Sequence, residues 1–236
     1  MKLIAFICTM AVLVTAFPAS ADDHHILFRE NFANLDNWKP FTFPKIKKHS
    51  VYTIEKEGEK HILKVESCAS ASAIVYKDAF NVYDHPKVKW RWKVRNIYAK
   101  GNVRSKEGDD YPIRVYIMFE YDPEKAGRLE AIKYGFAKSL YGEYPPHSSL
   151  SYIWSSKEDP EKFVVSPYTD KAVMVLLEKG PAKAGTWVDE EIDILADYQK
   201  AFGTKPSARA RIAIMNDSDN TGESSVSYIE YIEVFK

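Results

Sequence analysis

The chain has 236 residues, and its 33 basic and 33 acidic side chains give a formal net charge of zero at pH 7. A balanced charge gives no support to nucleic-acid binding or to a polybasic membrane-binding surface. Aromatic residues, many of them Tyr and Trp, make up 14% of the chain, which fits both a β-sandwich core and a sugar-binding surface.

The first 21 residues have the pattern of a secretory signal. Lys2 precedes an apolar run at residues 3–17, and the small residues 19–21 form a cleavage site. The apolar run is shorter than the roughly 20 residues that a membrane-spanning helix needs, and no later run approaches that length. We therefore expect residues 1–21 to be a signal peptide and the mature protein to be periplasmic or secreted.

The mature chain, residues 22–236, is long enough for one large all-β domain or two small ones. Because no Gly-, Ser- or Pro-rich linker divides it, we expect a single domain. Cleavage of the signal removes Cys8 and leaves Cys68 as a single thiol, which cannot form an internal disulfide.

Residues 88–95 alternate strictly between apolar and basic side chains. This period of two predicts a strand with one buried face and one wet face. Trp90 and Trp92 share the apolar face with Val88 and Val94, so we expect both indole rings in the core rather than on a ligand-binding surface.

A second strand is predicted at residues 112–121, and one of its faces is polar. Arg114, Tyr116, Met118 and Glu120 lie on that face, opposite an apolar row. They place a cation, a hydroxylated ring and a carboxylate within about 20 Å of strand. The alternative interpretation is a solvated outer face on which Arg114 and Glu120 are too far apart to bond directly.

Other short segments between turn residues also have strand character, as a β-sandwich requires. They are residues 28–32, 51–55, 62–67, 73–77, 150–154, 172–177, 187–194, 208–215 and 225–235. Helical spacing predicts one helix that begins at Asp122 and continues to Leu140, and a second that ends at Gly203 after residues 195–202. The predicted fold is a single antiparallel β-sandwich with one or two short helices inserted.

The polar run at residues 216–222 reads Asn-Asp-Ser-Asp-Asn-Thr-Gly, and it includes Asp217, Asp219 and Thr221. These residues match the first half of an EF-hand loop, but Tyr228 stands at the twelfth position, where that loop requires a bidentate Glu. An EF-hand is therefore excluded, and we predict no cofactor. Two alternatives stay open: calcium held by another arrangement, and a hairpin turn whose side chains bind backbone N–H groups.

Catalytic patterns are incomplete. Residues 191–193 are similar to the Glu-x-Asp core of a group of lectin-like glycoside hydrolases, but Ala196 stands where the second carboxylate is expected, and Asp197 would need a change of register. The histidines do not have the spacing of a zinc site. The sequence therefore identifies no catalytic residue and no metal ligand.

Five motifs in the same order resemble the bacterial family DUF3047. They are Trp90-Arg91-Trp92, the segment 109–119 with Asp109-Asp110-Tyr111-Pro112 and Arg114, Ser151-Tyr152-x-Trp154, the segment 197–203, and the segment 217–222. The resemblance covers nearly all of the mature chain. It implies an exported jelly-roll or concanavalin-like sandwich, and it brings no activity with it.

Three functional hypotheses follow. The first is non-catalytic binding of a carbohydrate or another cell-envelope ligand; its predicted site residues are Asp109, Asp110, Arg114, Tyr116, Glu120, Tyr152, Trp154, Asp217, Asp219 and Thr221. The second is a glycan-active hydrolase or lyase that uses two of the carboxylates as acid and base. The third is a structural envelope protein without a small ligand. A shared site requires Arg114 within about 15 Å of Asp110 or Asp217.

Overall fold

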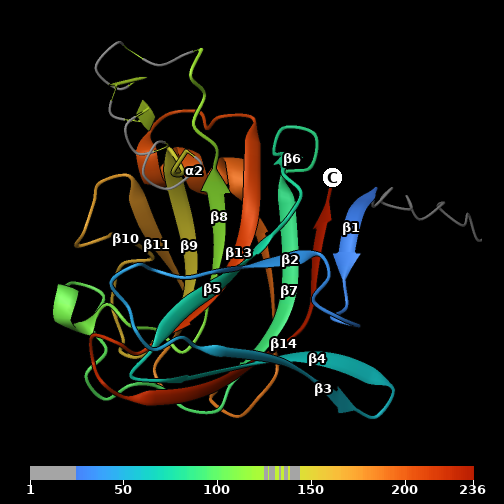
Figure 1. The fold of residues 1–236 in the computed structure, drawn as a ribbon, viewed down its shortest axis with the longest axis vertical. Helices are drawn as coiled ribbons and strands as arrows, with labels where there is room; N and C mark the ends of the chain where they lie inside the picture. The colour runs from blue at the N-terminus through green and yellow to red at the C-terminus, as the bar shows by residue number, and fades with distance from the viewer. Residues whose placement is uncertain (1–24, 125–126, 128–130, 133, 136–137, 139–143) are drawn as a thin grey trace, which may run out of the picture.

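The computed structural model describes residues 25–236 except 125–126, 128–130, 133, 136–137 and 139–143. Two β-sheets pack face to face, which confirms the predicted β-sandwich (Figure 1). Helix α2 and strand β6 lie at one end of the sandwich, and the β3–β4 hairpin lies at the other (Figure 1). In the described part of the chain, no helix has the length and apolar character needed to cross a membrane.

The first sheet has six strands, all paired antiparallel. In spatial order they are β12 (Val188–Asp193), β7 (Lys87–Val94), β14 (Ser224–Phe235), β4 (Lys60–Cys68) and β3 (Val51–Glu57), and β1 (Ile26–Glu30) pairs with the C-terminal half of β14. β14 is therefore the central strand of this sheet, because it pairs with three other strands, β1, β4 and β7.

The second sheet has eight strands. In spatial order they are β10 (Phe163–Val165), β11 (Ala172–Lys179), β9 (Ser148–Ser155), β8 (Arg114–Phe119), β13 (Arg209–Asp217), β5 (Ala71–Tyr76) and β2 (Trp38–Phe41), and β6 (Phe80–Asn81) pairs with β13. β9 and β11 run parallel, unlike the antiparallel pairing predicted throughout. The chain between them reverses through β10, which pairs antiparallel with β11.

The core lies between the two sheets and contains large aromatic rings. Trp90 and Trp92 are fully buried, as predicted from the alternation along β7. Their rings contact Tyr152 and Trp154 across the sandwich, with centroids 5.6 Å apart for Trp90–Tyr152 and 6.0 Å apart for Trp92–Trp154. Such tilted ring pairs stabilise the fold by more than the burial of their apolar surface alone.

The strands that the sequence predicts all have counterparts, whereas the short strands β2, β6 and β10 were not predicted. The second predicted helix is confirmed as α2 (Ile194–Phe202), which is capped by the Asp193 carboxylate and ends at Gly203 with a left-handed φ of 69°. Most of the helix predicted from Asp122 lies outside the described residues.

A second, smaller apolar cluster covers part of the outer face of the eight-stranded sheet. Val103 and Tyr111, from the long connection between β7 and β8, pack there on Ile153, Met174 and Leu176 of β9 and β11. The connection also contains the short 3-10 helix η1 (Lys106–Gly108). This packing holds the segment that follows η1, residues 109–112, against the sheet beside Arg114.

Candidate functional site

Arg114 and Asp217 form a buried ion pair on the outer face of the eight-stranded sheet. β8 and β13 are neighbours in register, with Arg114 opposite Met215. The Arg114 Nε donates to Asp217 Oδ1 at 2.9 Å, and its Nη2 donates to Asp217 Oδ2. Nη2 also donates to the Asp109 carbonyl oxygen at 2.7 Å. The two predicted segments, 109–114 and 216–222, therefore lie in direct contact.

Asp110 joins the same group by binding the loop that follows β13. Its Oδ2 accepts a hydrogen bond from the backbone N–H of Thr221 at 2.6 Å, and its Oδ1 accepts one from the Asn220 side chain at 3.3 Å. Gly222 closes the loop with a φ of 73° and donates its N–H to the Ser218 carbonyl. The polar run is thus a well-bonded turn, as one of the two alternatives predicts, and Thr221 contributes its backbone N–H to it.

We call the group Asp109, Asp110, Arg114, Asp217 and Asp219 the carboxylate corner. All of its members except Asp219 are buried. Burial raises the pKa of Asp217 to about 7, although the Arg114 guanidinium opposes this rise. Burial and the neighbouring Asp110 carboxylate also raise the pKa of Asp219. Both shifts have the same physical cause, because a low dielectric and nearby carboxylates disfavour the charged form.

Two other predicted site residues lie on the outer face but bind elsewhere. Tyr116 packs beside Met215, with its hydroxyl 3.8 Å from the Met215 sulfur, and burial raises its pKa. Glu120 lies just beyond the end of β8 and accepts hydrogen bonds at 3.0 Å from Arg209 and from Arg211. Glu120 is therefore engaged in ion pairs on the neighbouring strand β13.

Tyr152 and Trp154, which were predicted to bind ligand, lie on the inner face of β9. Both are fully buried; the Tyr152 hydroxyl donates to Asp197 at 3.2 Å, and the Trp154 indole N–H donates to the Gly180 carbonyl at 3.1 Å. Alternation along β9 turns Ile153, not these rings, toward the outer face. Neither ring can stack on a sugar on the outer face. The prediction that Tyr152 and Trp154 bind ligand is therefore corrected, because β9 directs both side chains into the core.

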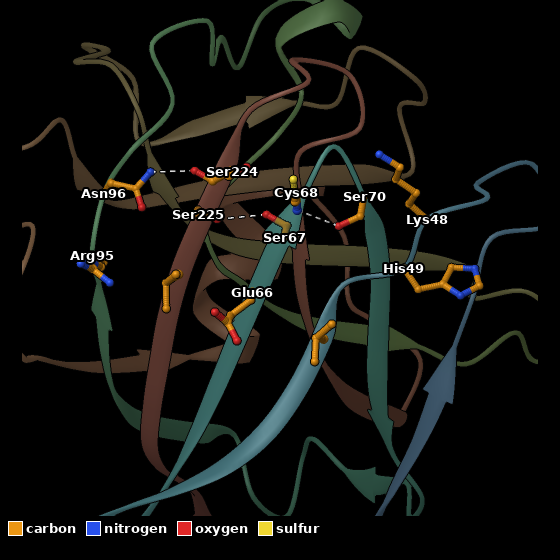
Figure 2. Close-up of a pocket in the computed structure, with 12 residues that line it drawn as sticks. Lys48, His49, Glu66, Ser67, Cys68, Ser70, Arg95, Asn96, Ser224 and Ser225 are labelled. Atoms are coloured by element: carbon orange, nitrogen blue, oxygen red, sulfur yellow. Dashed lines mark hydrogen bonds between the residues drawn. The ribbon is translucent and has the colours of Figure 1, made fainter.

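The structure also contains an open pocket of about 650 Å³, which we call the Cys68 pocket (Figure 2). It lies where β3, β4 and β14 meet the loops beside them. Its lining comes from four segments of the chain: Lys48, His49 and Val51; Glu66, Ser67, Cys68 and Ser70; Arg95 and Asn96; and Ser224, Ser225 and Val226. The sequence did not predict this pocket, because no single segment supplies more than four of its residues.

The Cys68 pocket contains two cations, Lys48 and Arg95, and one carboxylate, Glu66. Lys48 and Arg95 are exposed, and neither forms an ion pair there. Glu66, by contrast, is paired with Lys64 at 3.2 Å. In Figure 2, Arg95 and Lys48 come from opposite sides of the pocket, with Cys68 between them. The pocket therefore presents two cations without ion-pair partners in the described residues, on a lining whose exposed surface is mostly apolar.

A buried hydrogen-bond network joins the floor of the pocket to the carboxylate corner. The Tyr98 hydroxyl lies 2.9 Å from the Ser67 hydroxyl and 2.6 Å from the Ser225 hydroxyl. Ser225 donates to the Asn216 side-chain oxygen at 3.1 Å, and Asn216 directly precedes Asp217. The two regions therefore share a rigid support, because fully satisfied buried networks fix the position of their members.

Solved structures with a similar fold include proteins in complex with sugars. They include the family 11 carbohydrate-binding module from Clostridium thermocellum in complex with a mixed-linked tetrasaccharide (11% identity, 89% of this chain and 94% of that chain, TM-score 0.41). The lectin from Bauhinia forficata in complex with GalNAc has 10% identity over 88% of this chain and 97% of that chain, with a TM-score of 0.42. The xyloglucanase domain of NopAA from Sinorhizobium fredii has 8% identity over 84% and 93%, with a TM-score of 0.43.

At these identities and TM-scores, the solved structures assign no function to this chain. No curated protein matches it. The model of the family described as "Protein of unknown function (DUF3047)" matches residues 36–233. Because this match spans most of the chain, the protein belongs to the DUF3047 family.

Proposed function

We propose that this protein is an exported, non-catalytic binding protein for a carbohydrate or another hydroxyl-rich component of the cell envelope, and that the ligand binds in the Cys68 pocket. The observation that carries the proposal is the pocket itself. Its volume of about 650 Å³ falls within the range of small-molecule sites, about 300–1,000 Å³. Export is supported by the signal pattern at residues 1–21.

The lining of the pocket suits a ligand that carries hydroxyl groups. Serine hydroxyls can both donate and accept hydrogen bonds, and the Asn96 side chain adds an amide. Asn96 is held in place because its Nδ2 donates to the Ser224 carbonyl at 2.8 Å. The hydroxyls of Ser67, Ser70 and Ser225 are already hydrogen-bonded inside the protein. The exposed Ser224 hydroxyl and the Asn96 side-chain oxygen are therefore the polar groups that can orient a small ligand.

Charge in the pocket further favours a ligand with an acidic group, such as a carboxylate, sulfate or phosphate. Lys48 and Arg95 provide two cations without ion-pair partners in the described part of the chain, and hydrogen bonds between ionised groups are about twice as strong as neutral ones. The single carboxylate among the lining residues, Glu66, shares the Lys64 ammonium with Glu55, so Lys48 and Arg95 leave the lining with a net positive charge. An acidic sugar therefore fits this site better than a neutral one.

Binding is favoured over glycoside chemistry because the carboxylates are not arranged for catalysis. A glycosidase needs two carboxylates on either side of the bond to be broken, at about 5–9.5 Å. Both oxygens of Asp217 are bound by Arg114, and both oxygens of Asp110 are bound by the 220–221 loop. In the pocket, Glu66 has no second carboxylate among the lining residues.

The test is a calorimetric titration of the mature protein with galacturonate oligomers and with neutral galactose oligomers. The wild type is expected to bind the acidic series more tightly, and the double variant Lys48→Gln/Arg95→Gln is expected to lose about tenfold or more in affinity, since two charged hydrogen bonds are removed. Lys56→Gln, which removes an exposed charge outside the pocket, should bind as the wild type does.

Two outcomes would contradict the proposal. If neither series binds the wild type, the structural-protein hypothesis takes its place. If the double variant and Lys56→Gln bind acidic oligomers equally well, the ligand does not occupy the Cys68 pocket.

A further inference from the structure

The carboxylate corner contains more buried negative charge than buried positive charge. Asp109, Asp110 and Asp217 are 7%, 0% and 2% exposed, and Arg114 is the one buried cationic side chain in the described part of the chain. A buried charge costs several kcal/mol unless it is paired. Arg114 can balance one of the three carboxylates, so the corner is short of positive charge.

The geometry of the carboxylates shows where that charge is missing. One oxygen from each of Asp110, Asp217 and Asp219 lies within 4.8 Å of the other two. Carboxylates this close repel one another unless they share a cation or a proton. Oxygens that bind one calcium ion at 2.3–2.6 Å are separated by at most about 5 Å, so the observed spacing matches a shared ion.

Asp109 supplies an independent sign of a missing positive group. Its Oδ1 is buried and accepts no hydrogen bond from the described residues. Its Oδ2 lies 3.6 Å from Nη1 of Arg114, the same guanidinium that binds Asp217, so the Asp109 carboxylate faces the corner. A buried carboxylate oxygen without a donor is rare and costly, and a cation in the corner would relieve it electrostatically.

We propose that a divalent cation of the calcium type binds in the carboxylate corner, with Asp110, Asp217 and Asp219 as its protein ligands. The three residues offer only oxygen, which suits calcium rather than zinc or copper. Asp219 is the partly exposed member and gives the ion access from solvent. The ion ties the loop after β13 to the segment before β8, and this role is separate from ligand binding in the Cys68 pocket.

The experiment measures the melting temperature of chelator-treated protein with and without calcium, and the luminescence of terbium, which replaces calcium and is excited through nearby tyrosines. Binding to the folded state alone must stabilise it, so calcium at a hundred times its Kd should raise the melting temperature by about 5–10 °C. Magnesium and manganese are tested in parallel to establish selectivity.

The informative variant is Asp219→Asn, because the Asp219 side chain is partly exposed and its loss should not prevent folding. Without calcium, this variant should melt at or above the wild-type temperature, since one repelling carboxylate is gone. With calcium, it should lose the stabilisation and the terbium signal. Asp84→Asn, an exposed carboxylate on the loop after β6, is the matched control and should respond as the wild type does.

The proposal is overturned if no divalent ion shifts the wild-type melting temperature, or if Asp219→Asn keeps the full calcium response. Lys48→Gln/Arg95→Gln should retain the calcium response. Failure of the cation site is therefore distinguishable from failure of the pocket, because each has its own variant and its own readout.

Discussion

The carboxylate corner and the Cys68 pocket are connected through Asn216, but their charged side chains differ in burial and in pairing. In the corner, Arg114 and three carboxylates are buried; the oxygens of Asp110 and Asp217 accept hydrogen bonds from the protein, whereas Asp109 Oδ1 accepts none from the described residues. In the pocket, Lys48 and Arg95 are exposed and have no ion-pair partner in the described residues. Buried charges must be satisfied by the fold, whereas exposed ones are available to a ligand.

The largest expected effect comes from removing the buried cation. Arg114→Met should destabilise the protein by about 3–5 kcal/mol, because it leaves the Asp217 carboxylate buried and unpaired. Unfolding in urea, followed by tryptophan fluorescence, measures the change. The matched variant Arg95→Met removes an exposed cation and should change stability by less than about 0.5 kcal/mol.

The two arginine variants together test the comparison between the regions. Arg95→Met should weaken the binding of acidic sugars and leave stability unchanged. Arg114→Met should lower stability and leave the binding of acidic sugars unchanged, provided that binding is measured well below the melting temperature of the variant. If Arg114→Met is as stable as Arg95→Met, the corner is not the structural centre that its burial indicates.

A smaller effect is expected from the network that joins the regions. Tyr98→Phe removes a buried hydroxyl that contacts Ser67 and Ser225, so it should cost about 1–3 kcal/mol. It should also weaken ligand binding, because both serines line the pocket. Tyr83→Phe, which removes one hydrogen bond to the Pro206 carbonyl on a ring that is 43% exposed, is the control and should cost less. Unchanged binding in Tyr98→Phe would show that the network supports only the corner.

A third environment, that of Glu190 on β12, tests how burial acts on a carboxylate that feels Lys183 and Lys162 but forms no ion pair among the described residues. Burial raises the pKa of Glu190 to about 7, the Glu178 carboxylate adds to the rise, and a hydrogen bond from the Trp92 indole opposes it. An unfolded Glu has a pKa of about 4.3, so between these values the folded chain holds a proton that the unfolded chain has lost. Stability must therefore fall as pH rises through this window.

Glu190→Gln removes the titrating group, so its stability should fall less than that of the wild type between pH 5 and pH 8. The comparison of the two proteins at each pH by urea unfolding isolates Glu190 from other titrating groups. Equal slopes for the wild type and the variant would contradict the raised pKa.

Alternation and motif order made much of the fold predictable. The strict pattern along residues 88–95 fixes which face is buried, and it correctly places Trp90 and Trp92 in the core. The sequence placed the segments around Arg114 and Asp217 beside predicted strands but left open whether they meet, and the structure brings them into contact.

The same reasoning fails on β9, for a physical reason. The eight-stranded sheet is covered on both faces there, so Ile153 on the outer face is as apolar and as buried as Leu150 on the inner one. Periodicity cannot then indicate which way Tyr152 and Trp154 point. The Cys68 pocket was unpredictable for a different reason, since its lining depends on the pairing of β4 with both β3 and β14.

The smallest expected change in stability comes from replacing Cys68, whose free, exposed thiol lies in the pocket. Cys68→Ser should change stability by less than about 0.5 kcal/mol, because the side chain is not part of the core. The thiol nevertheless reports on occupancy: an acidic sugar bound in the pocket should slow its reaction with a maleimide, whereas calcium bound in the carboxylate corner should not. If calcium slows the reaction as strongly as the sugar does, Asn216 transmits changes between the regions, and the corner and the pocket work as one site.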